Sequence, residues 1–215
     1  VVGEIVLRDQ SINLSKLNIQ SNMGNGNLTM VYRAKNGQEA TAGLDLDMED
    51  VKVEKLIALF PSIDTLVPML RSFEGVLDCQ VTATCKMDST MSLIMPSINS
   101  SCYLHGDNMV LLDGETFTEI SKTLMFKNKK RNMIDSISVD LAIKDNKIEV
   151  FPFLVEMDRY KVAVGGTHNL DMTFNYHLSV LKSPVPFKLG IDITGNLDDF
   201  KYKITKCKYK DSFKP

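Results

Sequence analysis

The sequence lacks any long hydrophobic run. Its longest apolar stretches are short pieces such as Leu56–Phe60 and Val110–Leu112, and neither approaches the roughly 20 residues that a membrane-spanning helix needs. A basic and then apolar leader is also missing, and the first residue is Val1 rather than Met. We therefore interpret the sequence as a piece of a longer protein, whose anchor or signal lies outside these 215 residues.

An excess of charge of one sign is missing too. The chain has 25 Lys and Arg against 27 Asp and Glu, a formal net charge of -2, which argues against a nucleic-acid binder held by phosphate neutralisation. A hydrophobic content of 44% and a charged content of 24% are ordinary for a globular protein and argue against disorder. The length fits one large all-β domain or two small domains, and we expect a single β-rich domain over residues 1–215.

The cysteine pattern gives no sign of a metal or redox site. None of Cys79, Cys85, Cys102 and Cys207 forms a CxxC pair, and no histidine stands at a spacing that would complete a zinc site. Cys79 and Cys85 lie about 20 Å apart along one expected strand, too far for a disulfide bond. Their alternation with polar residues favours a role as small buried hydrophobic side chains. We expect no metal and no cofactor.

Catalytic motifs are also missing. The chain has no GxSxG elbow, no GxxxxGK[ST] loop and no HExxH pair. Its histidines are scattered, and His177 falls on the polar face of its strand, where we expect it to face solvent. The acidic stretch from Asp45 to Asp50 lacks the glycine and the final glutamate of an EF-hand loop, and we interpret it as the start of a helix. We therefore expect no enzymatic activity and no catalytic residue.

The dominant pattern is an alternation of apolar and polar residues. Its clearest case covers residues 77–88, roughly 40 Å of extended chain, which is longer than most strands. Because alternate residues of a strand point to opposite faces, this segment has one dry face and one wet face. The apolar or soft positions of this segment are Leu77, Cys79, Val81, Ala83, Cys85 and Met87.

The same alternation recurs on both sides of this segment. Residues 137–144 and 148–157 predict a hairpin around Asp145-Asn146-Lys147. A bulge is predicted at Phe151-Pro152, where the apolar residues of the second strand switch from even to odd positions. Strands are also predicted over 170–180, 187–193 and 200–204, with a break at 183–186 and a turn at Gly195-Asn196. Towards the N-terminus, residues 12–19 and 28–32 alternate more weakly around a predicted turn at Gly24-Asn25-Gly26.

Helical spacing replaces the alternation over residues 53–60, 63–70 and 116–124. The sequence therefore predicts a mainly β fold, a long curved antiparallel meander sheet with one to three short α-helices packed on it or at its end. One face of such a sheet is apolar and must be covered. The sheet is then an open groove or a partly closed barrel.

The last third of the chain resembles the C-terminal region of AsmA-like proteins, especially those of Bacteroidetes-type bacteria. Leu112-Asp113-Gly114 and the expected helix after it also look like that family, so the resemblance covers about residues 106–199. The motifs that carry it are turn signatures. They are Ile143 to Ile148, Gly166 to Met172, Tyr176-His177-Leu178, Lys182 to Phe187, and Gly195-Asn196-Leu197-Asp198.

The resemblance implies a periplasmic protein that is anchored to the inner membrane and concerned with outer-membrane biogenesis. The related TamB-like proteins form long β-grooves thought to carry lipids between membranes. The family has no catalytic residues that could be transferred to this sequence. The membrane anchor would lie in a segment outside these residues.

Two main hypotheses follow for the apolar face. In the first, a non-enzymatic segment handles or transfers phospholipid between membranes, with an adaptable lining that its many Met residues suit. In the second, the helices seal the face, and the sheet edges dock to other envelope proteins. A closed, lipocalin-like ligand barrel is a third and weaker hypothesis. For the first hypothesis the expected lipid-contacting residues are Val81, Ala83, Cys85, Leu141, Ile143, Met172, Phe174 and Tyr176.

Overall fold

A computed structural model describes residues 2–21, 24–35, 39–59, 68–112, 131–157, 159–184, 188–196 and 199–213. Over these residues the chain forms one antiparallel sheet of 13 strands, one helix and two short 3-10 turns. The predicted mainly β architecture is therefore confirmed.

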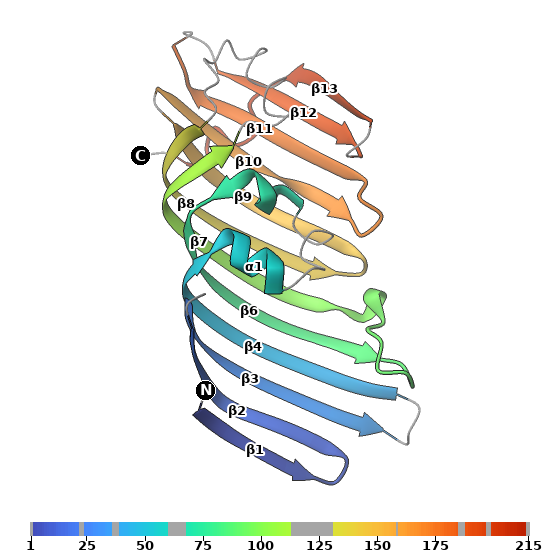
Figure 1. Cartoon of the computed structure of the whole chain (residues 1–215). Helices are drawn as coiled ribbons and strands as arrows, with labels where there is room; N and C mark the ends of the chain where they lie inside the picture. The colour runs from blue at the N-terminus through green and yellow to red at the C-terminus, as the bar shows by residue number, and fades with distance from the viewer. Residues whose placement is uncertain are drawn as a thin grey trace.

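The sheet is a meander, as predicted, because each strand pairs with the next along the chain. Only β5 (Phe73–Glu74) lies off this path, and it pairs with β7. The stack runs from β1 at one end to β13 at the other without closing into a barrel (Figure 1). Its strands are β1 (Val2–Arg8), β2 (Ser11–Ser21), β3 (Gly24–Lys35), β4 (Glu39–Lys52), β6 (Val76–Met87), β7 (Asn99–Leu112), β8 (Arg131–Lys144), β9 (Lys147–Met157), β10 (Tyr160–Asn169), β11 (Phe174–Lys182), β12 (Leu189–Gly195) and β13 (Phe200–Thr205).

The predicted hairpin of β8 and β9 is confirmed. Asp145 and Asn146 both have positive φ, 52° and 62°, as the two central residues of a type I′ turn require. The predicted bulge is confirmed as well, because Val150 pairs with Gly166 and Phe153 with Val164, so that two residues of β9 oppose one of β10.

Further irregularities keep apolar side chains on one face where the alternation shifts. Between Met48 and Val51 the register of β4 shifts at Asp50, whose φ is 56°. A similar shift in β2, between Leu14 and Leu17, lies at Lys16, whose φ is 51°. Each extra residue changes the parity of its strand and returns the next apolar side chain to the same face.

Two predictions about local structure are wrong near the N-terminus. The acidic stretch from Asp45 to Asp50 lies in β4 rather than at a helix start, because Leu44, Leu46 and Met48 alternate with the carboxylates and pair with apolar residues of β3 and β6. Gly24 to Gly26 begin β3 rather than forming the turn before it.

The start of the predicted strand over 170–180 is also wrong. Leu170 and Met172 lie in the turn between β10 and β11, and β11 begins at Phe174. The Asn169 N–H donates to the Thr173 carbonyl, and the Asp171 carboxylate accepts hydrogen bonds from the N–H and hydroxyl of Thr173. These local side-chain bonds favour a turn over a continued strand.

A short cap lies over the middle of the sheet. It consists of helix α1 (Val53–Leu59), where the sequence predicts the first helix, the 3-10 turn η1 (Pro68–Ser72) and β5. In Figure 1 α1 lies in front of the central strands of the sheet, and it contacts β4, η1 and β5. The expected helix over 63–70 overlaps η1 only at its end and otherwise lies outside the described residues, as does the whole of the one over 116–124. A second 3-10 turn, η2 (Met95–Ser97), precedes β7.

Candidate functional site

The candidate site is the apolar face of the sheet. The strand register joins one residue of this face from every strand of the main path into a single row, which we call the first rung. Apart from Ser100 and His168, its members have apolar side chains or none. The first rung is Ile5, Leu14, Met30, Leu44, Ala83, Ser100, Ile143, Ile148, His168, Phe174, Gly195 and Phe200.

A second rung lies beside the first, from β2 to β13. The second rung is Leu17, Leu28, Leu46, Val81, Cys102, Leu141, Val150, Gly166, Tyr176, Ile193 and Tyr202. Neither rung contains Asp, Glu, Lys or Arg. At about 4.8 Å per strand spacing, the rungs run for roughly 50 Å across the sheet. The hydrocarbon layer of one bilayer leaflet, which is about as deep as an acyl chain is long, measures roughly 15 Å. The rungs are therefore several times longer than one acyl chain.

The predicted site residues mostly share this face. Six of them lie on the rungs, and Cys85 belongs to the same face, where it pairs with Ala42. Met172 does not, because it lies in the turn before β11. The six rung members are Ala83, Ile143 and Phe174 in the first rung and Val81, Leu141 and Tyr176 in the second.

The sequence indicated alternating strands around Leu14 and Met30, but it did not place them or Leu44 among the lipid-contacting residues. Leu14, Met30 and Leu44 continue the first rung through β2, β3 and β4. The alternation of Leu44, Leu46 and Met48 is a sufficient signal, but the intervening carboxylates also suit a helix start. Those carboxylates belong to the opposite face of the strand, where they are exposed.

Three free cysteines, Cys79, Cys85 and Cys102, lie on this face. Cys79 and Cys102 are on neighbouring strands, and a hydrogen bond joins their thiols. That bond and burial raise the pKa of the Cys102 thiol far above its ordinary value. Burial also raises the pKa of Cys85. The same hydrogen bond lowers the pKa of the Cys79 thiol. All four cysteines are free thiols, and Cys85 and Cys102, whose pKa values are raised, add no charge to the face at neutral pH.

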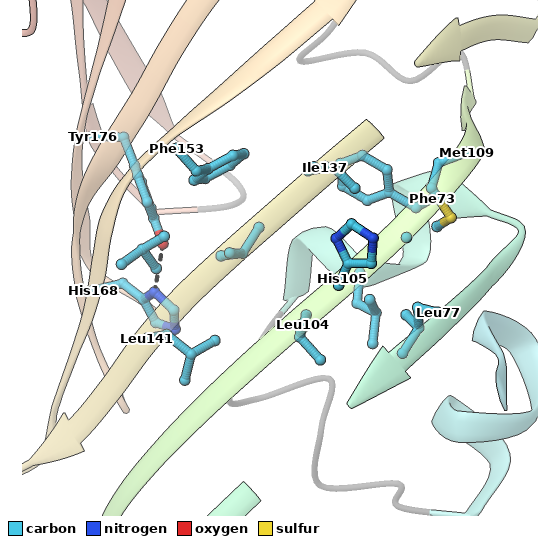
Figure 2. A pocket seen from close by; sticks show the side chains of 14 residues that line it. Phe73, Leu77, Leu104, His105, Met109, Ile137, Leu141, Phe153, His168 and Tyr176 are labelled. Atoms are coloured by element: carbon cyan, nitrogen blue, oxygen red, sulfur yellow. Dashed lines mark hydrogen bonds between the residues drawn. The ribbon is translucent and has the colours of Figure 1, made fainter. Parts of the chain in front are cut away.

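A cavity lies between the cap and the sheet (Figure 2). Its volume is about 70 Å³, and its walls are almost wholly apolar. Two of the polar residues in these walls, Tyr176 and His168, belong to the rungs. The Tyr176 hydroxyl and His168 Nδ1 share a hydrogen bond of 2.8 Å. Burial raises the pKa of Tyr176 to about 12, so its hydroxyl is neutral at physiological pH.

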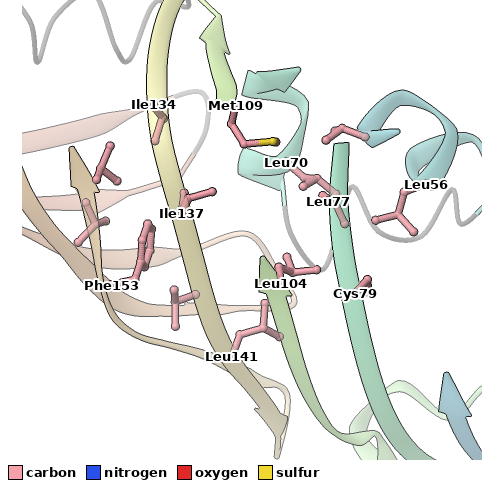
Figure 3. Close-up of a cluster of buried hydrophobic side chains, with 14 of the residues drawn as sticks. Leu56, Leu70, Leu77, Cys79, Leu104, Met109, Ile134, Ile137, Leu141 and Phe153 are labelled. Atoms are coloured by element: carbon pink, nitrogen blue, oxygen red, sulfur yellow. The ribbon is translucent and has the colours of Figure 1, made fainter. Parts of the chain in front are cut away.

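The centre of the face is sealed and its two ends are open. Leu141 and Ile148 are 3% and 0% exposed, and Leu56 and Leu70 reach from the cap towards Leu77 of β6 (Figure 3). Towards the ends, the rung residues of β2, β3, β11 and β13 are mostly half-buried. At the outermost strands Ile5 is 63% exposed and Tyr202 is 49% exposed. The described structure is therefore neither a fully sealed core nor an open trough throughout.

The prediction that His177 faces solvent is wrong. Its side chain is buried because Lys208 and Tyr209, near the C-terminus, cover the polar face of β11. The Lys208 N–H donates to His177 Nε2, so the proton of the neutral ring is on Nδ1, which donates to Asp192 at 2.5 Å. The Ser179 hydroxyl then donates to Nε2 at 2.9 Å.

This Ser179, His177 and Asp192 arrangement resembles a hydrolase triad in its distances only. Ser179 has no exposed surface, and its oxygen accepts the Tyr209 N–H at 3.0 Å. A substrate carbonyl would have to reach that oxygen, and the covering segment occupies its place. Burial alone would raise the pKa of Asp192, but hydrogen bonds from Lys208 and His177 and the charge of Lys208 lower it below its usual range. The network therefore holds the C-terminal segment against the sheet.

Within the described residues, no group of three His, Cys, Asp or Glu side chains could hold a metal ion. No helix among those residues has the length and apolar character needed to cross a bilayer. No protein family, curated protein or solved structure matches the chain.

Proposed function

We propose that this chain is a non-enzymatic lipid-handling segment whose apolar face holds the acyl chains of phospholipid. One observation carries the proposal. Two charge-free rungs cross nearly the whole sheet, and their residues are left partly uncovered at both ends. A large exposed apolar surface of this kind marks a binding surface in soluble proteins.

Hydrocarbon suits this face better than a protein partner. Protein interfaces carry about one hydrogen bond per 100–200 Å² and a polar rim. The rungs offer few side-chain donors or acceptors, and the strand ladders already use the backbone groups beneath them. Acyl chains need no hydrogen bonds. Met30 and the polarizable cysteine thiols let the apolar face adapt to chains of varied shape.

The resemblance to AsmA-like proteins supports a location for this activity. We place the protein in the periplasm, anchored to the inner membrane by a segment outside this sequence, and concerned with outer-membrane biogenesis. Transfer of phospholipid between the two membranes is then the role of the face. The partners would be lipid and envelope proteins rather than nucleic acid.

A second candidate function is docking by the sheet edges, and β1 favours it. Among the described strands β1 pairs only with β2, and it exposes Val2, Ile5 and Leu7. An unpaired edge with exposed apolar side chains is a template for another strand. A structural module that joins envelope proteins through β1 or β13 would use these features and leave the rungs empty.

Native mass spectrometry of the protein purified without detergent distinguishes the two functions. The lipid-handling function predicts co-purified phospholipid, released as intact lipid on collisional activation. Lipid-free protein that stays empty after incubation with phosphatidylethanolamine vesicles would contradict it and favour the docking module.

A further inference from the structure

One side of the cavity beneath the cap is formed by residues of the cap and of β7. Leu70 and Phe73 come from the cap, and Met109 of β7 pairs with Ile134 of β8. Leu70 and Met109 are almost fully buried, and Phe73 is half-buried. Figure 2 shows the Phe73 and Met109 group at one side of the cavity and the Tyr176 and His168 pair at the other. The pair belongs to the rungs, so the cavity is continuous with the apolar face.

The chemistry of the walls excludes a lipid headgroup. No Asp, Glu, Lys or Arg lines the cavity. Tyr176 and His168 direct their polar atoms at each other, at 2.8 Å, and His168 is only 5% exposed. His105 also borders the cavity, but its ring nitrogens are engaged by Ser138 at 2.8 Å and Asp107 at 3.5 Å. A phosphate placed there would lose its hydration without a compensating cation.

The size of the cavity fits the end of a hydrocarbon chain. Its volume of about 70 Å³ is about half that of the 150 Å³ engineered apolar cavity that binds benzene. A whole phospholipid cannot enter, whereas the last few carbons of one unbranched chain can. Dispersion contacts with Leu77, Leu104 and Phe153 would stabilise them without any polar group.

We propose that this cavity is the seat for the methyl end of an acyl chain, so that a bound lipid lies tail-first under the cap with its headgroup at an open end of the face. This assignment rests on the proposed function and adds an orientation to it.

The absence of tryptophan from the sequence allows a direct test. In Phe73→Trp the single indole replaces a ring that lines the cavity. The variant is loaded from phosphatidylglycerol vesicles, separated from them, and its fluorescence is measured. The lipid carries bromine either near the methyl end of its chains or near the ester. We expect a larger fractional loss of fluorescence with bromine near the methyl end.

Phe200→Trp, at the β13 end of the first rung, is the matched control and should not show that order. Val139→Trp, which also lines the cavity, replaces Phe73→Trp if the latter fails to fold. If lipid binds but the cavity tryptophan loses equal fluorescence with both bromine positions, or loses more with bromine near the ester, the tail-first orientation alone is overturned. Lipid absent from all variants and from the unmodified protein would overturn the proposed function itself.

Discussion

Replacing Ala83 by Glu is expected to lower phospholipid retention about 100-fold or more while the protein stays folded. Ala83 lies on the first rung between Leu44 and Ser100 and is only half-buried, so the longer side chain has room to reach solvent. A carboxylate held against bound hydrocarbon costs several kcal/mol, and each 1.4 kcal/mol is a factor of ten in affinity. Lipid counts per protein by native mass spectrometry give the retention, and circular dichroism gives the fold.

Thr84→Glu is the matched control. Thr84 is the next residue of β6, points to the opposite face and is exposed, so the same charge there should leave retention unchanged. Equal retention in the two variants would show that lipid does not use this face. Loss of the β spectrum in Ala83→Glu alone would instead indicate that this part of the face is sealed.

Truncation of Ile148 to Ala is expected to cost about 2–5 kcal/mol of unfolding free energy, the usual range for a buried isoleucine. Ile148 has no exposed surface and sits on the first rung between Ile143 and His168, where the face is covered. The neighbouring strands cannot close the resulting void, because the hydrogen-bonded ladder fixes their spacing. Urea denaturation followed by circular dichroism measures the change.

The neighbouring variant Glu149→Ala, on the exposed face of β9, should change the same free energy by no more than about 0.5 kcal/mol. Met30→Ala, on the first rung but half-buried, should cost less stability than Ile148→Ala and still weaken lipid retention. A small cost for Ile148→Ala would contradict the view that the centre of the face is a packed core and only its ends are free for ligand.

Much of the sheet could be predicted because its strands follow a period of two. Alternation over Leu77 to Met87 and around Asp145-Asn146 specified strands, faces and a tight turn, and short connections specified the meander. The bulge at Phe151–Pro152 was visible because an extra residue must be inserted where the parity of a continuing strand changes. Six of the predicted site residues therefore meet on two neighbouring rungs.

The remaining features depend on contacts that a local pattern does not contain. His177 has the position of a solvent-facing residue in its strand, and only the return of Lys208 and Tyr209 to that strand buries it. Carboxylates at Asp45 and Asp47 suit a helix start as well as the wet face of a strand, and pairing with β3 and β6 decides between them. The cavity needs the cap, β7 and β11 together.

The central claim, that acyl chains lie on the rungs, is tested most directly by photo-crosslinking. The protein is loaded with a phospholipid that carries a diazirine in its acyl chain, irradiated, and mapped residue by residue by tandem mass spectrometry. We predict adducts on half-buried rung residues such as Leu14, Met30 and Phe174. Adducts confined to the opposite face, at residues such as Thr84 and Asp45, or no adducts at all, would contradict the account.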